Sequence, residues 1–420
     1  MHRLLAALLA AASCATMAQA QSSPPAEAGQ TLSLDRALQL AGATSPSLDA
    51  AEAEIQNAAA ARTVAGLRPN PSVTFEVENV AGSGMYRGVE SLEATTSLAL
   101  PIELGGKRSA RIGVADARSQ RTLIQAAITQ ADLRLSVIQA YAEAAAAQQR
   151  LTTVRDQARI AAEGLHAAQV RVQAGRASPL EAERANVARI NADAEVERTQ
   201  RLVEVTRYTL SSIIGQPVAG NLDTEWFANV RAAYGPMQAI ESAGTLAMAA
   251  AEADLAIADA GVRLARAQRV PDLTVGAGAR YLRETGDTAA LFSISIPLPL
   301  FNDGRAANAQ ASSERLRAEA QQRVTAIEVD RAIARAQAEA ANAATTAATA
   351  SGPALQAAEE AARIARIGYR EGKFGQLELL DAERTLAETR LAAIDALLNY
   401  HSAQAQLERL TVRAPDLQGN

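Results

Sequence analysis

The sequence of 420 residues has little of what most enzymes and disulfide-linked proteins depend on. It contains one cysteine, Cys14, and 3 histidines. A single cysteine excludes an internal disulfide framework and a thiolate metal cluster. No group of His, Cys, Asp and Glu has the spacing of metal ligands, and the chain contains no Walker loop and no Gly-x-Ser-x-Gly turn. We therefore expect no enzyme activity, no cofactor and no metal site.

The chain also has few aromatic residues and no excess of positive charge. Aromatic residues make up 3% of the chain, although 48% of its residues are hydrophobic. The formal net charge is −5, which argues against a broad basic surface for nucleic acid. Alanine is abundant instead, most densely in 126–162 and 332–366. Because alanine favours helices and lets them pack closely, this composition predicts long, closely packed helices.

No apolar run beyond the N-terminus approaches the length of about 18 residues that a membrane helix needs. Residues 1–20 have the basic start, short apolar core and Ala18-Gln19-Ala20 end of a secretory signal peptide. The segment Ala11-Ala12-Ser13-Cys14 resembles a lipoprotein box, with Ala11 where a bulky aliphatic residue is usual. Cleavage after Ala20 and lipidation of Cys14 both remain open, and either one takes the protein out of the cytoplasm.

A duplication runs through the chain. Three segments recur in the same order at nearly one spacing, a pattern that chance does not readily produce. They are 70–75 with 270–275, 97–101 with 293–297, and 174–181 with 371–378. The predicted organisation is a linker at 21–33, a first repeat at 34–214, an irregular link at 215–240, a second repeat at 241–411 and a tail at 412–420.

Both repeats have the same predicted order of elements. A helix comes first, over about 34–67 and about 241–268. Two segments with alternating apolar and polar residues follow, which predicts strands over about 72–80 and 91–100, and over about 272–282 and 289–297. Each repeat ends in a helical hairpin. We expect an uninterrupted long helix over 104–174 or 303–370, a turn at 174–179 or 371–376, and a return helix over 180–214 or 376–411.

Four strands per chain are too few to close a barrel, since the smallest closed barrels have about eight. Their predicted length nevertheless suits a strand that spans an outer membrane, which needs about 9–11 residues. With the apolar face toward lipid, the charged strand residues would face a wet interior: Glu76, Glu78, Glu93 and Arg280. The sequence therefore predicts an oligomeric outer-membrane pore that continues into a helical tunnel.

Over nearly the whole mature chain, this duplication resembles the TolC-type outer-membrane efflux proteins. Within that family, four segments are similar to the branch that serves cobalt–zinc–cadmium resistance pumps. They are Arg68-Pro69-Asn70-Pro71, Glu76-Val77-Glu78-Asn79, the stretch from Leu100 to Arg108 (LPIELGGKR), and the stretch from Ile296 to Arg305 (IPLPLFNDGR). The chain departs from the branch at Leu100, where Gln is common.

The resemblance implies a mainly α fold with a membrane β part. Three chains would share a twelve-stranded outer-membrane β-barrel continuous with a periplasmic α-helical barrel. It also implies the passive exit duct of a tripartite resistance-nodulation-division (RND) efflux system for heavy-metal cations or small toxic molecules. The implied partners are two further copies in a homotrimer, a periplasmic adaptor protein, an inner-membrane RND pump and outer-membrane lipid, with no nucleic acid.

The same resemblance places the periplasmic end of the tunnel at the two hairpin turns. The turn residues Gly175, Arg176, Gly372 and Lys373 would contact the adaptor. A gate would be formed by Glu378, Asp381, Glu181 and Tyr369, and the i,i+3 spacing of Glu378 and Asp381 independently places both on one helix face. The basic residue that locks the gate in the family corresponds to Phe374 here, and Arg370, Lys373 and Arg384 remain alternative replacements.

Three alternatives compete with this interpretation. A duct of the same fold could serve drug efflux or type I protein secretion. A periplasmic adaptor would show one helical hairpin inserted in a β domain, whereas this chain has two matched hairpins. A structural coiled-coil protein would carry heptads through 72–100 and 271–297, where strand patterns occur instead. The sequence does not name the substrate.

Overall fold

The computed structural model describes residues 31–218, 220–231 and 240–416. The predicted signal peptide and Cys14 lie outside the described residues, as do parts of the predicted linker, inter-repeat link and tail. The described chain is mainly helical, as the resemblance implied. It divides into two compact units, and each is considered by itself. Unit 1 comprises the described part of Met1–Thr44 with Val137–Arg231 and Thr346–His401, and unit 2 contains the remainder.

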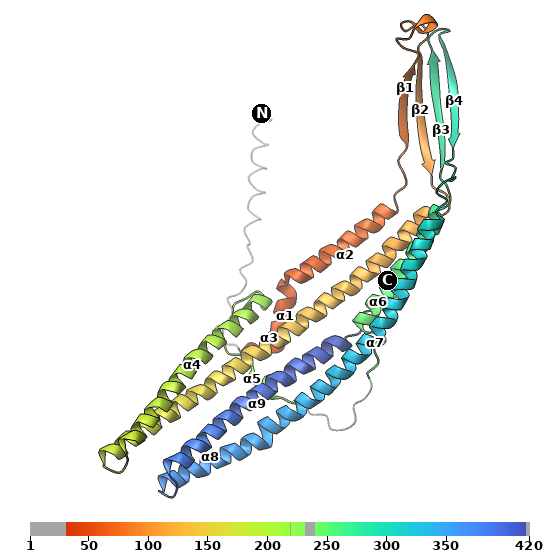
Figure 1. Cartoon of the computed structure of the whole chain (residues 1–420). Helices are drawn as coiled ribbons and strands as arrows, with labels where there is room; N and C mark the ends of the chain where they lie inside the picture. The colour runs from red at the N-terminus through yellow and green to blue at the C-terminus, as the bar shows by residue number, and fades with distance from the viewer. Residues whose placement is uncertain (1–30, 219, 232–239, 417–420) are drawn as a thin grey trace, which may run out of the picture. The chain divides into compact units, whose positions relative to one another are not determined.

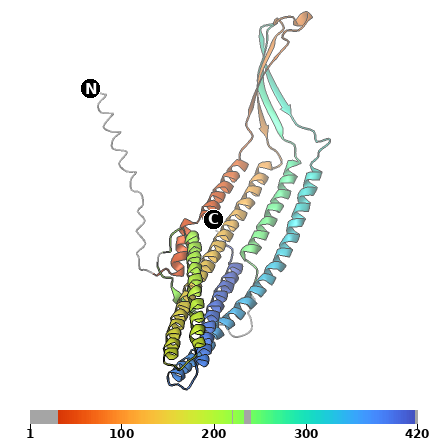
Figure 2. The ribbon, with the colours of Figure 1, turned by 60° about the vertical axis from the view of Figure 1, so that its left-hand side comes forward.

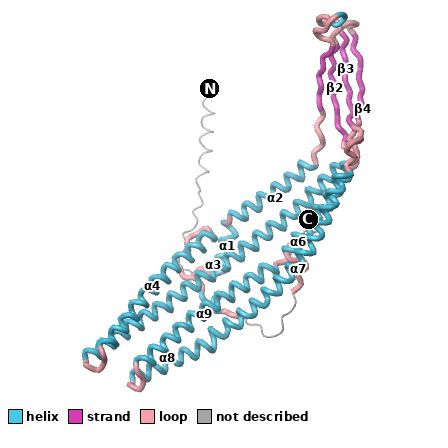
Figure 3. The backbone as a smooth tube through the Cα atoms, in the orientation of Figure 1, coloured by secondary structure: helices cyan, strands magenta, loops and turns pink. Residues whose placement is uncertain are grey.

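Unit 2 contains one antiparallel sheet with the order β1-β2-β3-β4 (Figures 1 and 3). Its strands are β1 (Ser72–Glu78), β2 (Glu93–Ile102), β3 (Leu273–Leu282) and β4 (Asp287–Ser295). The central pair joins the two predicted repeats, since β2 pairs with β3 from Glu93 opposite Leu282 to Ile102 opposite Leu273. β1 and β4 are therefore the two open edges of this sheet.

The two faces of the sheet differ in polarity because successive side chains point to opposite sides. One face carries large apolar groups that are strongly exposed: Val73 at 73%, Phe75 at 68%, Phe292 at 86% and Ile294 at 74%. The opposite face carries the charged residues Glu76, Glu78, Glu93 and Arg280, as their register shows. The structure of one chain thus leaves a complete apolar surface uncovered.

Four helical segments of unit 2 run alongside one another below the sheet (Figure 2). They are α2 (Pro46–Ala65), the first part of α3 (Lys107–Gln173), α6 (Leu246–Gln268) and α7 (Arg305–Thr349). Ion pairs link each neighbouring pair of helices: Arg62–Asp116, Arg121–Asp254 and Arg315–Asp259. Between α3 and α6, Ile124 packs on Ala250 and Ala253, so small side chains allow close approach.

Unit 1 contains two helical hairpins. The remainder of α3 pairs with α4 (Pro179–Ile214), and α8 (Leu355–Arg370) pairs with the part of α9 (Gln376–Thr411) that ends at His401. The cores are again built from alanine and a few aliphatic residues. One cluster joins Ala147, Leu151, Val154 and Val203, and the other joins Ala358, Ala362 and Leu386.

The segment between the predicted repeats is anchored inside unit 1 by aromatic residues. The hydroxyl of Tyr141 donates to the carbonyl of Leu32 over 2.6 Å and accepts from the N–H of Asp223 over 3.0 Å. The short helix α5 (Thr224–Ala228) places Trp226 against His401, with ring centroids 4.1 Å apart. Burial raises the pKa of Tyr141 to about 12, so this clamp stays uncharged at physiological pH.

Two of the expected helices are interrupted. The helix expected over 34–67 is divided into α1 (Leu34–Thr44) and α2, because Pro46 forces Ser45 into an extended conformation. The expectation of one helix over 303–370 overlooked Pro353. There the structure has a π-helical turn at Ala350–Ala354, and Gly352 leaves helical geometry with φ −102° and ψ −106°. Since proline removes a donor and crowds the preceding turn, the helix kinks between α7 and α8.

Candidate functional site

The charged residues of the sheet form a connected group on its polar face. Arg280 lies 2.8 Å from Glu93 and 3.3 Å from Glu78, and its Nε donates to the hydroxyl of Thr95. Glu76 stands opposite Thr95 in the register, on the same face. The four charged strand residues therefore lie on one face of the sheet, and two of the carboxylates, those of Glu78 and Glu93, contact the guanidinium of Arg280.

The two hairpin turns of unit 1 depend on glycine for a conformational reason. Gly175 has φ +67° and Gly372 has φ +74°, and nothing lies within 4 Å of a Cβ placed at either position. These turns thus need the left-handed backbone rather than empty space. The following N–H groups close the helix ends, since Arg176 donates to the carbonyl of Arg171 and Lys373 to that of Gly368, each over 2.8 Å.

Near these turns, Arg171 joins the two hairpins. It lies in the last turn of α3, and its Nη1 donates to the hydroxyl of Tyr369 at the end of α8 over 3.2 Å. The same atom is 3.1 Å from the carboxylate of Glu181 in the first turn of α4. The hydrogen bond to Tyr369 and the charge of Glu181 raise the pKa of Arg171, so it remains charged. Two of the predicted gate residues are thereby brought together.

The sequence interpretation missed Arg171. A usable signal existed, because Arg171 and Glu181 lie on either side of the turn at Gly175, where a tight hairpin brings opposite helices into contact. The link between Arg171 and Tyr369 could not be predicted from the sequence, because it depends on the packing of the first hairpin on the second.

The other two predicted gate residues lie apart from this group. Glu378 and Asp381 are exposed on the first turns of α9, and neither forms an ion pair or a hydrogen bond among the described residues. The carboxylate of Glu378 lies over the start of its own helix, since a Cβ on Gly375 would be 2.7 Å from its Oε2. An acid in that place also stabilises the helix N-terminus.

The position that corresponds to the family's basic lock folds back on its own turn. The ring of Phe374 covers Gly368, where a Cβ would lie 2.2 Å from the ring. Of the alternatives, Lys373 pairs with Glu371 and Arg384 pairs with Glu388, both locally. Arg370 has no such pair in the described part of the chain. None of the three makes the contact between hairpins that Arg171 makes.

Two further arginines hold the second hairpin closed on itself. Arg366 forms a bidentate pair with Glu383, whose side chain is only 9% exposed. Arg390 lies 3.0 Å from Glu359. The hydrogen bond to Glu383 raises the pKa of Arg366, although burial opposes this. Through these pairs α8 and α9 are fastened to one another beyond the turn.

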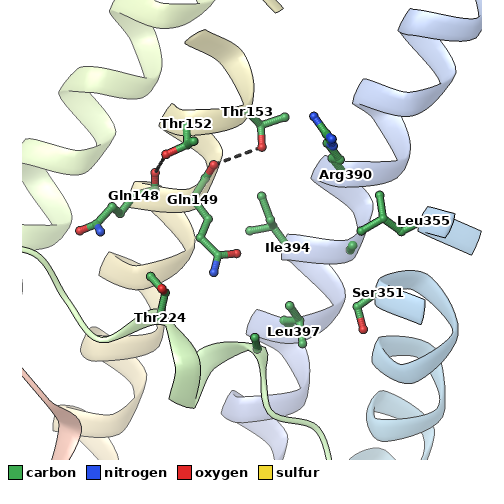
Figure 4. Close-up of a pocket in the computed structure, with 12 residues that line it drawn as sticks. Gln148, Gln149, Thr152, Thr153, Thr224, Ser351, Leu355, Arg390, Ile394 and Leu397 are labelled. Atoms are coloured by element: carbon green, nitrogen blue, oxygen red, sulfur yellow. Dashed lines mark hydrogen bonds between the residues drawn. The ribbon is translucent and has the colours of Figure 1, made fainter. Parts of the chain in front are cut away.

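A cavity of about 610 Å³ lies beside the kink in unit 1 (Figure 4). Ser351 and Leu355 border it on one side and Ile394 and Leu397 on another. The hydroxyls of Thr152, Thr153 and Ser351 each donate to a carbonyl of their own helix. The charged residue of its lining, Arg390, is already paired. The cavity therefore provides space beside the kink rather than a polar site poised for a ligand.

Within the described ranges, no group of three or more His, Cys, Asp and Glu side chains is placed to hold a metal ion. Among the same residues, no helix combines the length and the apolar character that crossing a membrane requires.

The model of the family described as "Outer membrane efflux protein" matches residues 37–216 and 238–412. The chain is 30% identical to the cobalt-zinc-cadmium resistance protein CzcC of Cupriavidus metallidurans, over 93% of this chain and 92% of that one. It is 31% identical to the nickel and cobalt resistance protein CnrC of the same organism, over 72% and 71%. The crystal structure of CusC superposes with a TM-score of 0.76 at 18% identity, over 91% of this chain and 92% of that one.

Proposed function

Because this chain belongs to the outer membrane efflux protein family, we propose that it is the outer-membrane exit duct of a tripartite RND system for heavy-metal cations. As a member of this family, the chain is a channel component rather than an enzyme. Membership of this family also argues against the alternative that the chain is a periplasmic adaptor. The metal assignment is supported by the names of the relatives that match most of the chain, which are cobalt, zinc, cadmium and nickel resistance proteins.

Three copies form the duct. The observation that carries this proposal is the sheet, whose edges β1 and β4 are open and whose apolar face is exposed. An open edge and an uncovered apolar face are both unfavourable in water. Pairing β4 of one copy with β1 of the next removes the edges, and three copies of four strands give a twelve-stranded barrel with its apolar face in outer-membrane lipid.

The polar face of the sheet then lines the lumen. Each copy contributes Glu76, Glu78 and Glu93 against one Arg280, so the lumen is net negative at this level. A ring of carboxylates attracts cations and repels anions. Arg280 limits that charge and holds two of the carboxylates in place.

The gate lies at the hairpin turns, in the periplasm. Arg171 ties the first hairpin to the second through Tyr369, which keeps the tips together in the closed state. Just beyond the turns, Glu378 and Asp381 of three copies form an acidic ring that admits cations. Gly175, Arg176, Gly372 and Lys373 present the tips to the adaptor, and the inner-membrane pump supplies the energy for transport.

Single-channel conductance in a planar bilayer tests the duct and the acidic ring together. We expect small, cation-selective currents that divalent cations block, and larger currents with weaker block after Glu378→Gln and Asp381→Asn. Glu388→Gln is the matched control, since Glu388 is an exposed acid of the same helix that pairs with Arg384.

Absence of a pore from a folded, membrane-extracted oligomer would refute the duct, and equal block in all variants would refute the ring. Growth of a deletion strain on zinc, cobalt and cadmium salts tests the substrate class. Sensitivity to organic drugs without sensitivity to these metals would favour the drug-efflux alternative.

A further inference from the structure

The sheet joins the helices at a tightly packed inner junction. There the link at 103–106, which follows β2, packs on the link at 269–272, which precedes β3. The N–H of Leu104 donates to Asp272 over 3.1 Å, and Lys107 lies 2.7 Å from the same carboxylate. Gly105 approaches so closely that a Cβ there would lie 2.6 Å from the Cβ of Val270 and 2.9 Å from the carbonyl of Ala267. This junction fixes where strand pairing stops and helix packing begins.

Two other links occupy the corresponding places in the duplicated sequence. The link at 296–304 follows β4 as 103–106 follows β2, and the link at 66–71 precedes β1 as 269–272 precedes β3. Both lie at the open edges of the sheet and carry exposed apolar side chains. Leu298 is 75% exposed, Leu300 78%, Phe301 102% and Leu67 59%. Two halves of a second junction are thus present in one chain without meeting.

We propose that these halves meet between copies, so that Phe301 of one copy packs on Leu67 and Asn70 of the next. Counted from the matching segments 97–101 and 293–297, Gly105 corresponds to Phe301, 196 residues later. Counted from 70–75 and 270–275, Leu67 and Asn70 correspond to Ala267 and Val270, 200 residues later. The second link is the longer of the two, since α7 starts 198 residues after α3. Gly105 contacts those two residues in the inner junction. The proposal rests on the trimer proposed above and names the residues that seal its seam.

The direction of the strands makes this contact geometrically consistent. In the inner junction the last residue of β2, Ile102, stands opposite the first residue of β3, Leu273. Antiparallel pairing of β4 with β1 of the next copy likewise brings the end of β4 to the start of β1. The links that follow and precede these strands then lie together, just as 103–106 and 269–272 do.

The chemistry of the two junctions differs in a way that suits the seam. The Lys107–Asp272 ion pair has no counterpart, because the residue that corresponds to Asp272 is the uncharged Ser72. The seam instead brings together two large apolar groups that the isolated chain exposes to solvent. Burying such groups against one another is favourable in proportion to the apolar area removed from water. The second copy is therefore the occupant that the apolar link at 296–304 requires.

Disulfide cross-linking of the intact, membrane-extracted protein tests this contact. The double variant Phe301→Cys with Leu67→Cys, after mild oxidation, should run as a covalent trimer on a heated, non-reducing gel. Each single variant is a matched control and should remain a monomer, as should Phe301→Cys combined with Val187→Cys, which adds an exposed cysteine on α4. Native mass measured before oxidation reports the trimer independently.

A native trimer without the cross-link would overturn the seam and leave the duct standing, whereas a native monomer without a pore would overturn both. As a second readout, Phe301→Ala should lower the temperature at which the trimer dissociates by several degrees, and Phe301→Leu should largely restore it. Met85→Ala, which alters another strongly exposed apolar residue, 78% exposed, should not change that temperature. If brominated phospholipid quenches the fluorescence of Phe301→Trp in reconstituted trimers, the link faces lipid and the proposal is wrong.

Discussion

Removing Arg171 should open the proposed gate. Arg171 is the side chain that links α3 to the end of α8, through Tyr369, while it also pairs with Glu181 on α4. Arg171→Ala deletes both contacts and creates no buried cavity, because the side chain is 40% exposed. We therefore expect the fold to persist and the balance between closed and open tips to shift.

The structure sets the size of this shift. An ion pair with partners exposed at 40% and 23% is partly screened and contributes about 0.5 kcal/mol. The hydrogen bond to Tyr369 adds about 1 kcal/mol. The pair with Glu181 lies within the first hairpin and is the same in both states, so each closed copy loses about 1 kcal/mol, which changes the ratio of open to closed tips about fivefold. If the three copies open together, the effect multiplies to about a hundredfold.

The assay is the open probability of single channels in a planar bilayer, without adaptor or pump. Arg159→Ala is the matched control, because it removes an arginine of the same helix whose partners lie on that helix. Tyr369→Phe should give part of the effect, and adding it to Arg171→Ala should change little further, since both act on one contact. If Arg171→Ala gates like Arg159→Ala, the link does not hold the tips closed.

Three predictions concern the stability of the fold. Burial lowers the pKa of His401, although its bond to the Phe227 carbonyl opposes this. The contribution of the neutral ring to stability is therefore fully present above pH about 6.5 and is lost as the pH falls below it. The melting temperature should drop between pH 7.5 and 5.5, and an equal drop in His401→Gln would contradict this. Tyr141→Phe removes the bonds of the hydroxyl to the Leu32 carbonyl and the Asp223 N–H, which remain bonded to each other over 3.1 Å. The change should therefore cost about 0.5–1.5 kcal/mol, measured by denaturant unfolding, and an unchanged midpoint would show that water replaces the hydroxyl. Gly372→Ala forces φ +74° on a residue with a Cβ and should cost about 1 kcal/mol, whereas Gly113→Ala, within a helix and with open space around it, should gain about 0.5–1 kcal/mol. Melting shifts of the same sign in these two variants would refute the conformational argument.

Local sequence patterns predicted strands well but helix continuity poorly. Alternation of apolar and polar residues reports a strand because it follows directly from the two-residue period of the backbone, and the structure has β1 to β4 in those segments. A composition that favours a long helix does not show where that helix is interrupted. Pro46 and Pro353 each break a helix that the surrounding alanines favoured, because one missing N–H and one steric clash outweigh the propensity of several neighbours.

Some features of the candidate site could likewise be predicted from the sequence, and others could not. The charges of the strands could be placed on one face from the sequence, since Glu76, Glu78 and Glu93 follow the alternation. Arg280, the partner of Glu78 and Glu93, comes from the other repeat, and its contact with them depends on the pairing of β2 with β3. The acids Glu378 and Asp381 could be placed on one helix face by their spacing. That Glu378 lies over its own helix start, rather than toward another charge, required the structure.

The sequence by itself determined that the chain is mainly helical and that it belongs to the outer membrane efflux protein family, because composition and local motifs are properties of neighbouring residues. Only the tertiary structure decided which distant residues act together. Arg171 meets Tyr369 across 198 positions of sequence, and Leu104 meets Asp272 across 168. Such contacts follow from how hairpins and strands pack on one another. The local sequence around each residue shows both partners of such a contact, but it does not show the packing that brings them together.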